Sequence, residues 1–193
     1  MPTHHAGTKH ADDYQHHLLG GSAFVNSRID WHLAGGLTEA AFWAFVMQDI
    51  QFSLAWQTPL CLHFERFREQ LDRTWHSERM RTTKSWVHRV IWLLAETVQY
   101  CCSTDPADQS KKEWEAIRAE LDDWERSRPA AFAPFFYRAA GEDNEDPLPT
   151  MWFSSLLHGM CHGFFLTILG EELVMVKNDR LTKSQFVHYN TYA

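Results

Sequence analysis

The chain has 193 residues, 45% of them hydrophobic and 14% aromatic, which is enough apolar material for one packed domain and excludes a disordered polymer. Its 18 lysines and arginines against 25 aspartates and glutamates give a net charge of −7, which disfavours a surface that binds nucleic acid by neutralising phosphates. The four cysteines form no C-x2-C pair and follow no signal peptide, so we expect reduced thiols in an intracellular protein. No apolar run is long enough to predict a membrane span.

The N-terminal residues 1–16 are poorly patterned and rich in histidine. The opening stretch "MPTHHAGTKHADDYQHH" holds five of the twelve histidines of the chain. Such a tract can bind a divalent metal, but its irregular spacing defines no rigid ligand geometry. We therefore predict a disordered polar terminus.

The segment 37–56 has the apolar period of an α-helix that is buried on more than one side. Its main stripe comprises Trp43, Val46, Met47, Ile50 and Leu54. Thr58 and Pro59 are expected to end this helix. At its centre stands the polar pair Gln48 and Asp49, which belongs either to a chemical site or to the wet face of a packed helix.

Three further helices are predicted downstream. A more exposed one covers 64–75, where Phe64, Phe67, Leu71 and Trp75 fall on one stripe. The segment 84–102 is apolar around most of its circumference and is expected to lie in the core, with Cys101 and Cys102 as buried or half-buried thiols. Ser110 and Glu113 form an S-x-x-E capping box, which starts a surface helix that should stop near Pro129.

The C-terminal part predicts an extended aromatic stretch, an acidic loop and one more helix. The stretch "RPAAFAPFFYRAAGEDNEDPLP" is bounded by prolines and carries the acidic residues 142–146. A helix is predicted over 150–169, closed by Gly170 and followed by an irregular tail over 170–193. Its expected buried stripe comprises Phe153, Leu156, Leu157, Met160 and Phe164.

No β-hairpin pattern and no strict alternation stand out in the sequence. The predicted fold class is therefore all-α, with antiparallel helices joined by irregular aromatic and proline-rich loops.

Two groups of residues raise the question of chemistry. His158 and His162 are spaced to share a metal on one helix face, but the glutamate of H-E-x-x-H and a third ligand are missing, so packed or hydrogen-bonded histidines are favoured. A small helical metal-binding protein or metalloenzyme stays an alternative.

The acidic pairs 12–13 and 122–123 and the loop 142–146 lack the D-D-x-x-D spacing of prenyl-diphosphate enzymes and are interpreted as solvated carboxylates. There is also no phosphate-binding loop, nucleophile elbow or dinucleotide fingerprint. We therefore expect neither an enzymatic activity nor a cofactor.

Four blocks, in this order, resemble the regulatory (middle homology) domain of fungal transcription factors of the binuclear zinc-cluster class. The blocks are "HLLGGSAFV" with "GLTEAAFWAFVMQDIQFSLAWQTPL", "WVHRVIWLLAETVQYCC", "EWEAIRAELDDWERSRPAAFAPFFYR" and "PLPTMWFSSLLHGMCHGFFLTIL". They place the regulatory-domain-like region at 17–169. The positions that match the family's motifs are Phe42, Trp43, Gln48, Asp49, Trp86, Glu96, Trp114, Trp124, Pro129, Pro134, Trp152 and His162.

The resemblance implies a nuclear protein that regulates transcription by RNA polymerase II through protein contacts, with co-regulators or the remainder of a transcription factor as partners. It also implies that Gln48 and Asp49 are structural and hydrogen-bond between helices or to a loop. Met47 stands where the family commonly has a basic residue, and the six-cysteine cluster that binds zinc and reads DNA is absent. We therefore expect a partial regulatory domain without zinc or direct DNA binding; a truncated product with little independent function is the other alternative.

Overall fold

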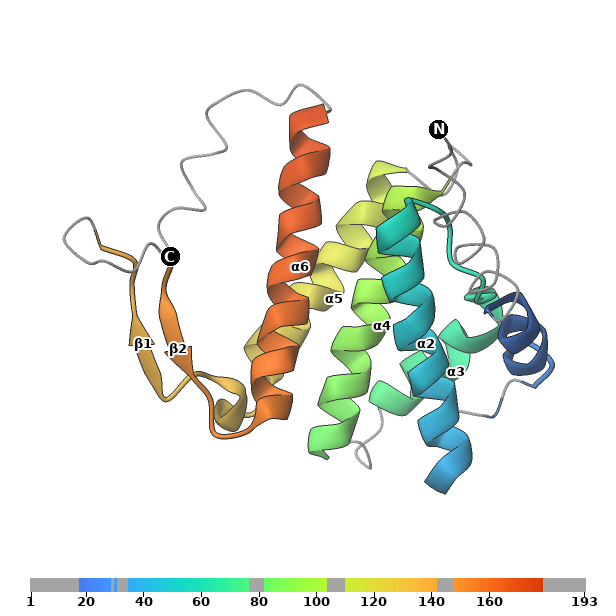
Figure 1. Cartoon of the computed structure of the whole chain (residues 1–193), viewed down its shortest axis with the longest axis horizontal. Coiled ribbons are helices and arrows are strands. Elements are labelled where there is room, and N and C mark those ends of the chain that lie inside the picture. Colours follow the sequence, from blue (N-terminus) through green and yellow to red (C-terminus); the bar gives the residue numbers. More distant parts are fainter. Residues whose placement is uncertain are drawn as a thin grey trace, which may run out of the picture.

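The computed structural model describes residues 18–28, 30, 35–76, 82–103, 110–141 and 148–178, with side chains as far as Gly170. Helices dominate, so the predicted all-α class is confirmed (Figure 1). Within these ranges, no helix combines the length and the apolar character that a membrane crossing requires. The expected disordered terminus, 1–16, lies outside the described residues.

Helix α4, Thr83–Cys102, is the centre of the fold. It contacts α2 (Gly36–Trp56), α5 (Lys111–Ser127) and α6 (Leu156–Asn178). In Figure 1, α2 and α6 stand on either side of α4 and α5 runs behind it. Because α4 is apolar on nearly every side, it is stable only when other helices surround it. Its fully buried side chains include Val90, Trp92, Ala95, Thr97 and Val98.

The helices predicted from 37 to 129 are confirmed with small shifts at their ends. α3 spans Glu65–Trp75, where Phe67 and Leu71 are buried, and α2 ends at Trp56 with Gln57 in a left-handed conformation. At the start of α5 the Ser110 hydroxyl accepts the backbone N–H of Glu113 at 3.2 Å, which is one of the two bonds of a capping box, while the Glu113 carboxylate pairs with Arg68. Cys101 and Cys102 are half-buried, as predicted.

A short β-hairpin follows α5, although no hairpin pattern stands out in the sequence. After the 3₁₀ turn η3 (Ala130–Phe132), β1 (Phe136–Arg138) pairs antiparallel with β2 (Thr150–Trp152), with Phe136 opposite Trp152. Strands of three residues are too short to show alternation, and a long connection replaces the two-residue turn that marks a hairpin in sequence. The predicted helix start at residue 150 is also wrong, because residues 150–152 form strand β2.

Helix α6 corrects three predictions. It begins at Leu156 and continues through Gly170 to Asn178, so Gly170 does not close it and residues 170–178 are not an irregular tail. The predicted stripe is also wrong, because Leu156, Leu157 and Met160 are exposed. The buried face consists of His158, Cys161, Phe165 and Ile168. The helix is apolar on several sides, and its period alone does not say which side meets the core.

The orientation of α6 can be tested by truncating one residue on each face. Ile168→Ala should lower the free energy of unfolding by about 2–5 kcal/mol, because it leaves a cavity against α4 and its neighbours. Leu156→Ala, at a side chain that is 83% exposed, should change it by less than about 0.5 kcal/mol. Urea unfolding of both variants measures the difference, and equal losses would contradict the observed orientation.

Candidate protein-contact surface and polar pocket

The polar pair at the centre of α2 divides into a buried anchor and an exposed side chain. Asp49 is 0% exposed, and its two carboxylate oxygens accept the backbone N–H groups of Cys61 at 3.0 Å and Leu62 at 2.9 Å. Desolvation raises the pKa of Asp49, and the two backbone hydrogen bonds oppose this increase. Gln48 lies on the exposed side of the helix. Asp49 therefore fixes the loop between α2 and α3.

Two more side chains hold the same loop. Gln99 of α4 accepts the backbone N–H of Leu60 at 3.0 Å. Asn26, which follows the short helix 18–25, donates to the carbonyl of Cys61 at 3.1 Å and accepts the N–H of His63 at 3.0 Å. The loop is thus tied to three separate segments through its backbone, and its buried polar groups are satisfied. These contacts explain why a carboxylate is buried at position 49, and they require no catalytic role for Asp49.

The tryptophans of the sequence blocks join helices. Trp43 of α2 stacks on His88 of α4 with ring centroids 4.1 Å apart. The buried Trp124 of α5 donates its indole N–H to the carbonyl of Trp86 at 2.9 Å. Trp114 is half-buried and packs its ring at a tilt on Tyr100, 5.5 Å away. These tryptophans therefore join α4 to α2 and α5, while the buried Phe42 of α2 packs on Phe67 of α3 at 5.3 Å.

The prolines and histidines of the other matched positions lie near the hairpin. Pro129 precedes η3 and the half-buried Pro134 follows it. His158 is buried, shares a hydrogen bond of 3.0 Å with the Ser154 hydroxyl and packs on the Phe132 ring at 4.4 Å. His162 is half-buried, its pKa is lowered by burial, and its ring lies 5.3 Å from that of Phe153.

No group of three histidine, cysteine or acidic side chains in the described part of the chain is arranged to hold a metal ion. The acidic pair of α5 is engaged in ion pairs: Asp122 with Arg118 at 3.0 Å, and Asp123 with Arg89 at 3.0 Å. The acidic residues 12–13 and 142–146 lie outside the described residues. Of these acidic groups the structure describes Asp122 and Asp123, and each is paired with an arginine.

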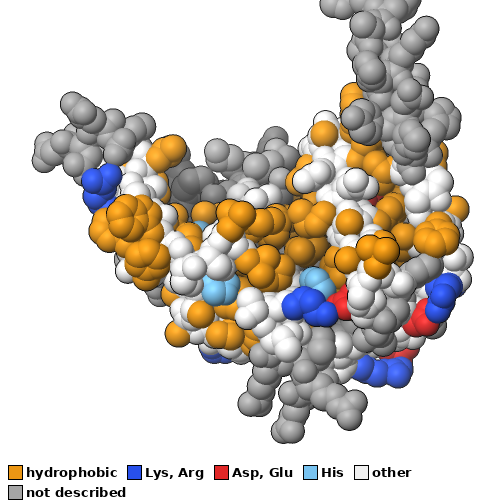
Figure 2. Space-filling model, turned by 60° about the horizontal axis from the view of Figure 1, so that its bottom comes forward, with side chains coloured by type: hydrophobic (Ala, Val, Ile, Leu, Met, Phe, Trp, Pro, Cys, Tyr) orange, Lys and Arg blue, Asp and Glu red, His pale blue; other side chains and the backbone are white. Residues whose placement is uncertain are grey.

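The hairpin carries an exposed aromatic cluster, which we call the hairpin surface together with the adjoining exposed residues of α6. Phe135 is 68% exposed and Trp152 is 56% exposed, and the rings of Phe136 and Trp152 pack on each other at 4.9 Å. Figure 2 shows hydrophobic side chains gathered on the hairpin and continuing across the adjacent helical face. The hairpin surface comprises Phe135, Phe136, Tyr137, Trp152, Leu156, Leu157, Met160 and Leu166.

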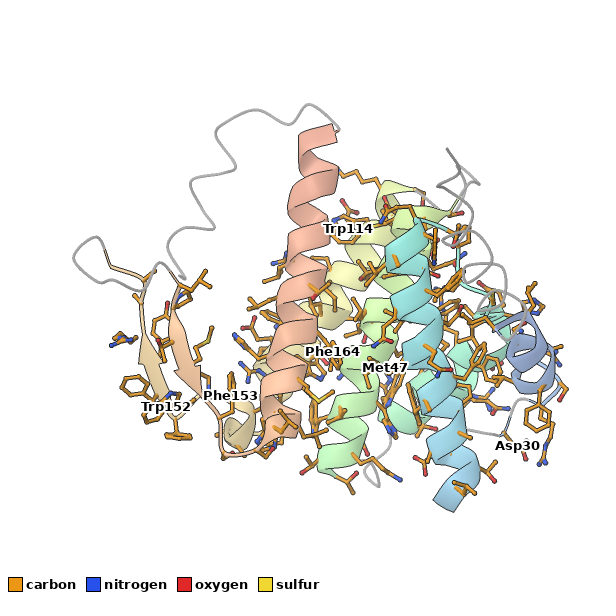
Figure 3. The ribbon with its side chains drawn as sticks, viewed as in Figure 1. Asp30, Met47, Trp114, Trp152, Phe153 and Phe164 are labelled. Carbon is orange, nitrogen blue, oxygen red and sulfur yellow. The ribbon has the colours of Figure 1, made fainter. Side chains whose placement is uncertain are left out.

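Neighbouring residues on this part of the chain have different environments. Figure 3 places Trp152 on the hairpin away from the helices and Phe153 between the hairpin and α6, while Phe164 projects from α6 on its α4 side. Phe153 contacts α6 closely enough that a Cβ added at Gly159 would lie 3.4 Å from its ring. Phe153 therefore holds the hairpin against α6. Trp152 stays exposed to solvent and is accessible to another molecule.

A pocket of about 390 Å³ lies between the loop 60–65 and helices α3, α4 and α5. Arg68 crosses it: its Nε donates to Glu96 at 3.0 Å and its Nη1 to Glu113 at 3.5 Å. Burial raises the pKa of Glu96 to about 7, although Arg68 favours the ionised carboxylate. A titratable group with a strongly shifted pKa therefore lines this cavity, which is a common property of binding sites.

No family model, curated protein or solved structure matches the chain. A functional assignment therefore depends on the residues and surfaces described above.

Sequence reasoning identified the loop anchor but missed both surfaces. Asp49 and Glu96 were among the matched positions, whereas the pairing of Glu96 with Arg68 joins residues that are far apart in sequence. The aromatic run from Phe135 to Tyr137 was visible as an extended stretch, and its lack of polar alternation was the available indication of an exposed cluster. No local sequence pattern indicates that the side chain of Leu156 faces solvent.

The role of the polar pair can be tested by comparing its two members. Asp49→Ala leaves the Cys61 and Leu62 N–H groups without their acceptor and should lower the free energy of unfolding by about 1–3 kcal/mol. Gln48→Ala, at an exposed helix position, should change it by less than about 0.5 kcal/mol. Urea unfolding measures both, and equal effects would show that Asp49 is not the anchor.

The raised pKa of Glu96 predicts a pH dependence of stability. Because folding raises this pKa from 4.5 to about 7, the contribution of Glu96 is fully present below pH 4.5 and is lost as the pH rises through about 7. Urea unfolding of the wild type should therefore show a decrease in stability across that window that Glu96→Gln lacks. The matched control is Glu115→Gln, at a side chain that is 63% exposed on α5 and should keep the wild-type profile. Identical profiles for all three proteins would refute the shift.

Proposed function

We propose that the chain is part of the helical regulatory domain of a fungal transcription factor of the zinc-cluster type, and that it acts on transcription by RNA polymerase II in the nucleus through protein contacts. The resemblance of the four sequence blocks supports the class of protein. The observation that carries the mode of action is the hairpin surface. Monomeric proteins rarely expose contiguous aromatic patches unless another molecule binds there.

The hairpin surface has the composition of a protein interface. Its tryptophan, tyrosine and phenylalanine rings bury large apolar areas at little conformational cost, which is why such residues dominate binding energy at interfaces. Its rings are also ordered before binding, because Phe136 and Trp152 are cross-strand partners in the hairpin. A protein partner, either a co-regulator or another part of the transcription factor, fits this surface.

The charge of the chain supports protein contact over contact with DNA. The net charge is −7, and the described faces of α5 carry acidic residues in ion pairs with neighbouring arginines. Phosphate recognition requires an excess of lysine and arginine on one face. In this proposal DNA binding is supplied by another polypeptide segment or by a partner, and zinc is not needed in this chain.

A tethering experiment tests the proposal. The chain is fused to an unrelated DNA-binding domain and expressed in a fungal cell with a reporter gene that carries the matching site. We expect the fusion to change reporter transcription several-fold relative to the DNA-binding domain alone. Unchanged transcription, or sequence-specific DNA binding by the purified chain with a steep salt dependence, would contradict the proposal.

Two tryptophan variants test whether the hairpin surface makes the contact. Trp152→Ala should weaken partner binding by about tenfold or more, as truncation of a central aromatic at an interface does, and should reduce the reporter effect accordingly. Trp56→Ala is the matched control, since Trp56 is 53% exposed on α2 and Trp152 is 56% exposed. Thermal unfolding confirms that both variants fold. If both variants act alike, the contact is made elsewhere.

A further inference from the structure

The pocket between α3, α4 and α5 is separate from the hairpin surface and shares no residue with it. Its volume of about 390 Å³ falls in the range of small-molecule sites, which run from about 300 to about 1,000 Å³. Residues from three helices and one loop converge on it, and that loop is fixed by Asp49 and Gln99. The pocket is therefore preformed, and a ligand bound there goes beyond the regulatory contact proposed above.

The charges that line the pocket favour a cation. Three glutamates, Glu65, Glu96 and Glu113, face one guanidinium, that of Arg68, together with His63. Arg68 is shared between Glu96 and Glu113, and each of these carboxylates has a second oxygen. One arginine therefore leaves negative charge in the pocket once Glu96, a side chain that is only 11% exposed, is ionised.

The remaining lining is apolar and aromatic. Phe64 and Tyr100 contribute rings, and Leu62 and Ile117 contribute aliphatic surface, and all four residues are buried. Such a lining accepts the hydrocarbon body of a ligand, and aromatic rings also attract an ammonium group. A bare metal ion would gain nothing from this part of the pocket.

We propose that this pocket binds a small organic ammonium ion, whose charged group lies against Glu96 and Glu113 and whose apolar body packs against Phe64, Tyr100 and Ile117. Arg68 positions the two carboxylates, and the ammonium adds the positive charge that one guanidinium cannot supply. The binding is reversible and involves no covalent step.

Calorimetry with three probes of nearly equal shape tests the charge preference. Phenethylamine, which is protonated at neutral pH, should bind at one equivalent and about tenfold or more tighter than phenylacetate or 2-phenylethanol. Preferential binding of phenylacetate would make Arg68 the anchor of an anion site and overturn the proposal. Absence of phenethylamine binding at millimolar concentration would also overturn it.

Three variants locate the site. Glu96→Gln and Glu113→Gln should each weaken phenethylamine binding by about tenfold. Glu115→Gln, on the same helix as Glu113 but outside the pocket, should bind like the wild type. Unfolding curves establish that each variant is folded, and undiminished binding by both pocket variants would refute the assignment.

The pH dependence of binding provides an independent readout. Because the pKa of Glu96 is about 7, wild-type affinity should rise between about pH 6 and about pH 8 as the carboxylate ionises, while the amine stays protonated. The other ionisable groups around Glu96 are Glu65, Arg68 and Asp72 of α3, Glu113 of α5 and His63 of the loop. Glu96→Gln should therefore remove most of the rise. An unchanged rise in Glu96→Gln would exclude Glu96 as the carboxylate that binds the ammonium.

Discussion

The burial of α4 on nearly all sides is the constraint on which the rest of the structure depends. A helix with Val90, Trp92, Ala95 and Val98 fully buried needs neighbours around it, and α2, α5 and α6 supply them. Polar groups on such a helix persist only when they are paired. Arg89 of α4, which is nearly buried, accordingly forms ion pairs with Glu120 and Asp123 of α5 at 2.7 and 3.0 Å.

The same constraint explains how the pocket arises. Near its C-terminal end α4 carries Glu96 and Gln99 in place of apolar residues, so the space beside them is not filled by packing. Gln99 holds the loop that follows α2, and Glu96 takes Arg68 of α3 as its partner. Asp49 of α2 fixes the same loop, because its carboxylate accepts two backbone N–H groups of that loop. The polar residues of the core therefore shape the pocket wall.

The structure separates two surfaces with different physical character. The hairpin surface is aromatic, exposed and carried by a two-stranded element at the edge of the helices (Figure 1), which suits a large apolar partner. The pocket is small, acidic and bounded by the packed helices, which suits a small charged molecule. The pocket is lined by α4 itself together with α3 and α5, and the hairpin lies against α6, which packs on α4, so α4 connects the elements that hold both surfaces.

The sequence by itself determined the helices from α2 to α5, because apolar periodicity, the Ser110 cap and the proline stops are local properties that survive in the fold. It also marked Asp49 as a polar residue in an apolar helix, and the family resemblance marked Glu96. Only the tertiary structure decided that Asp49 is buried while Gln48 is exposed, that Glu96 meets Arg68, that the aromatic stretch forms a strand, and which face of α6 is buried. These outcomes depend on contacts between residues far apart in sequence, and a helix that is apolar on several sides carries no local information about its partner.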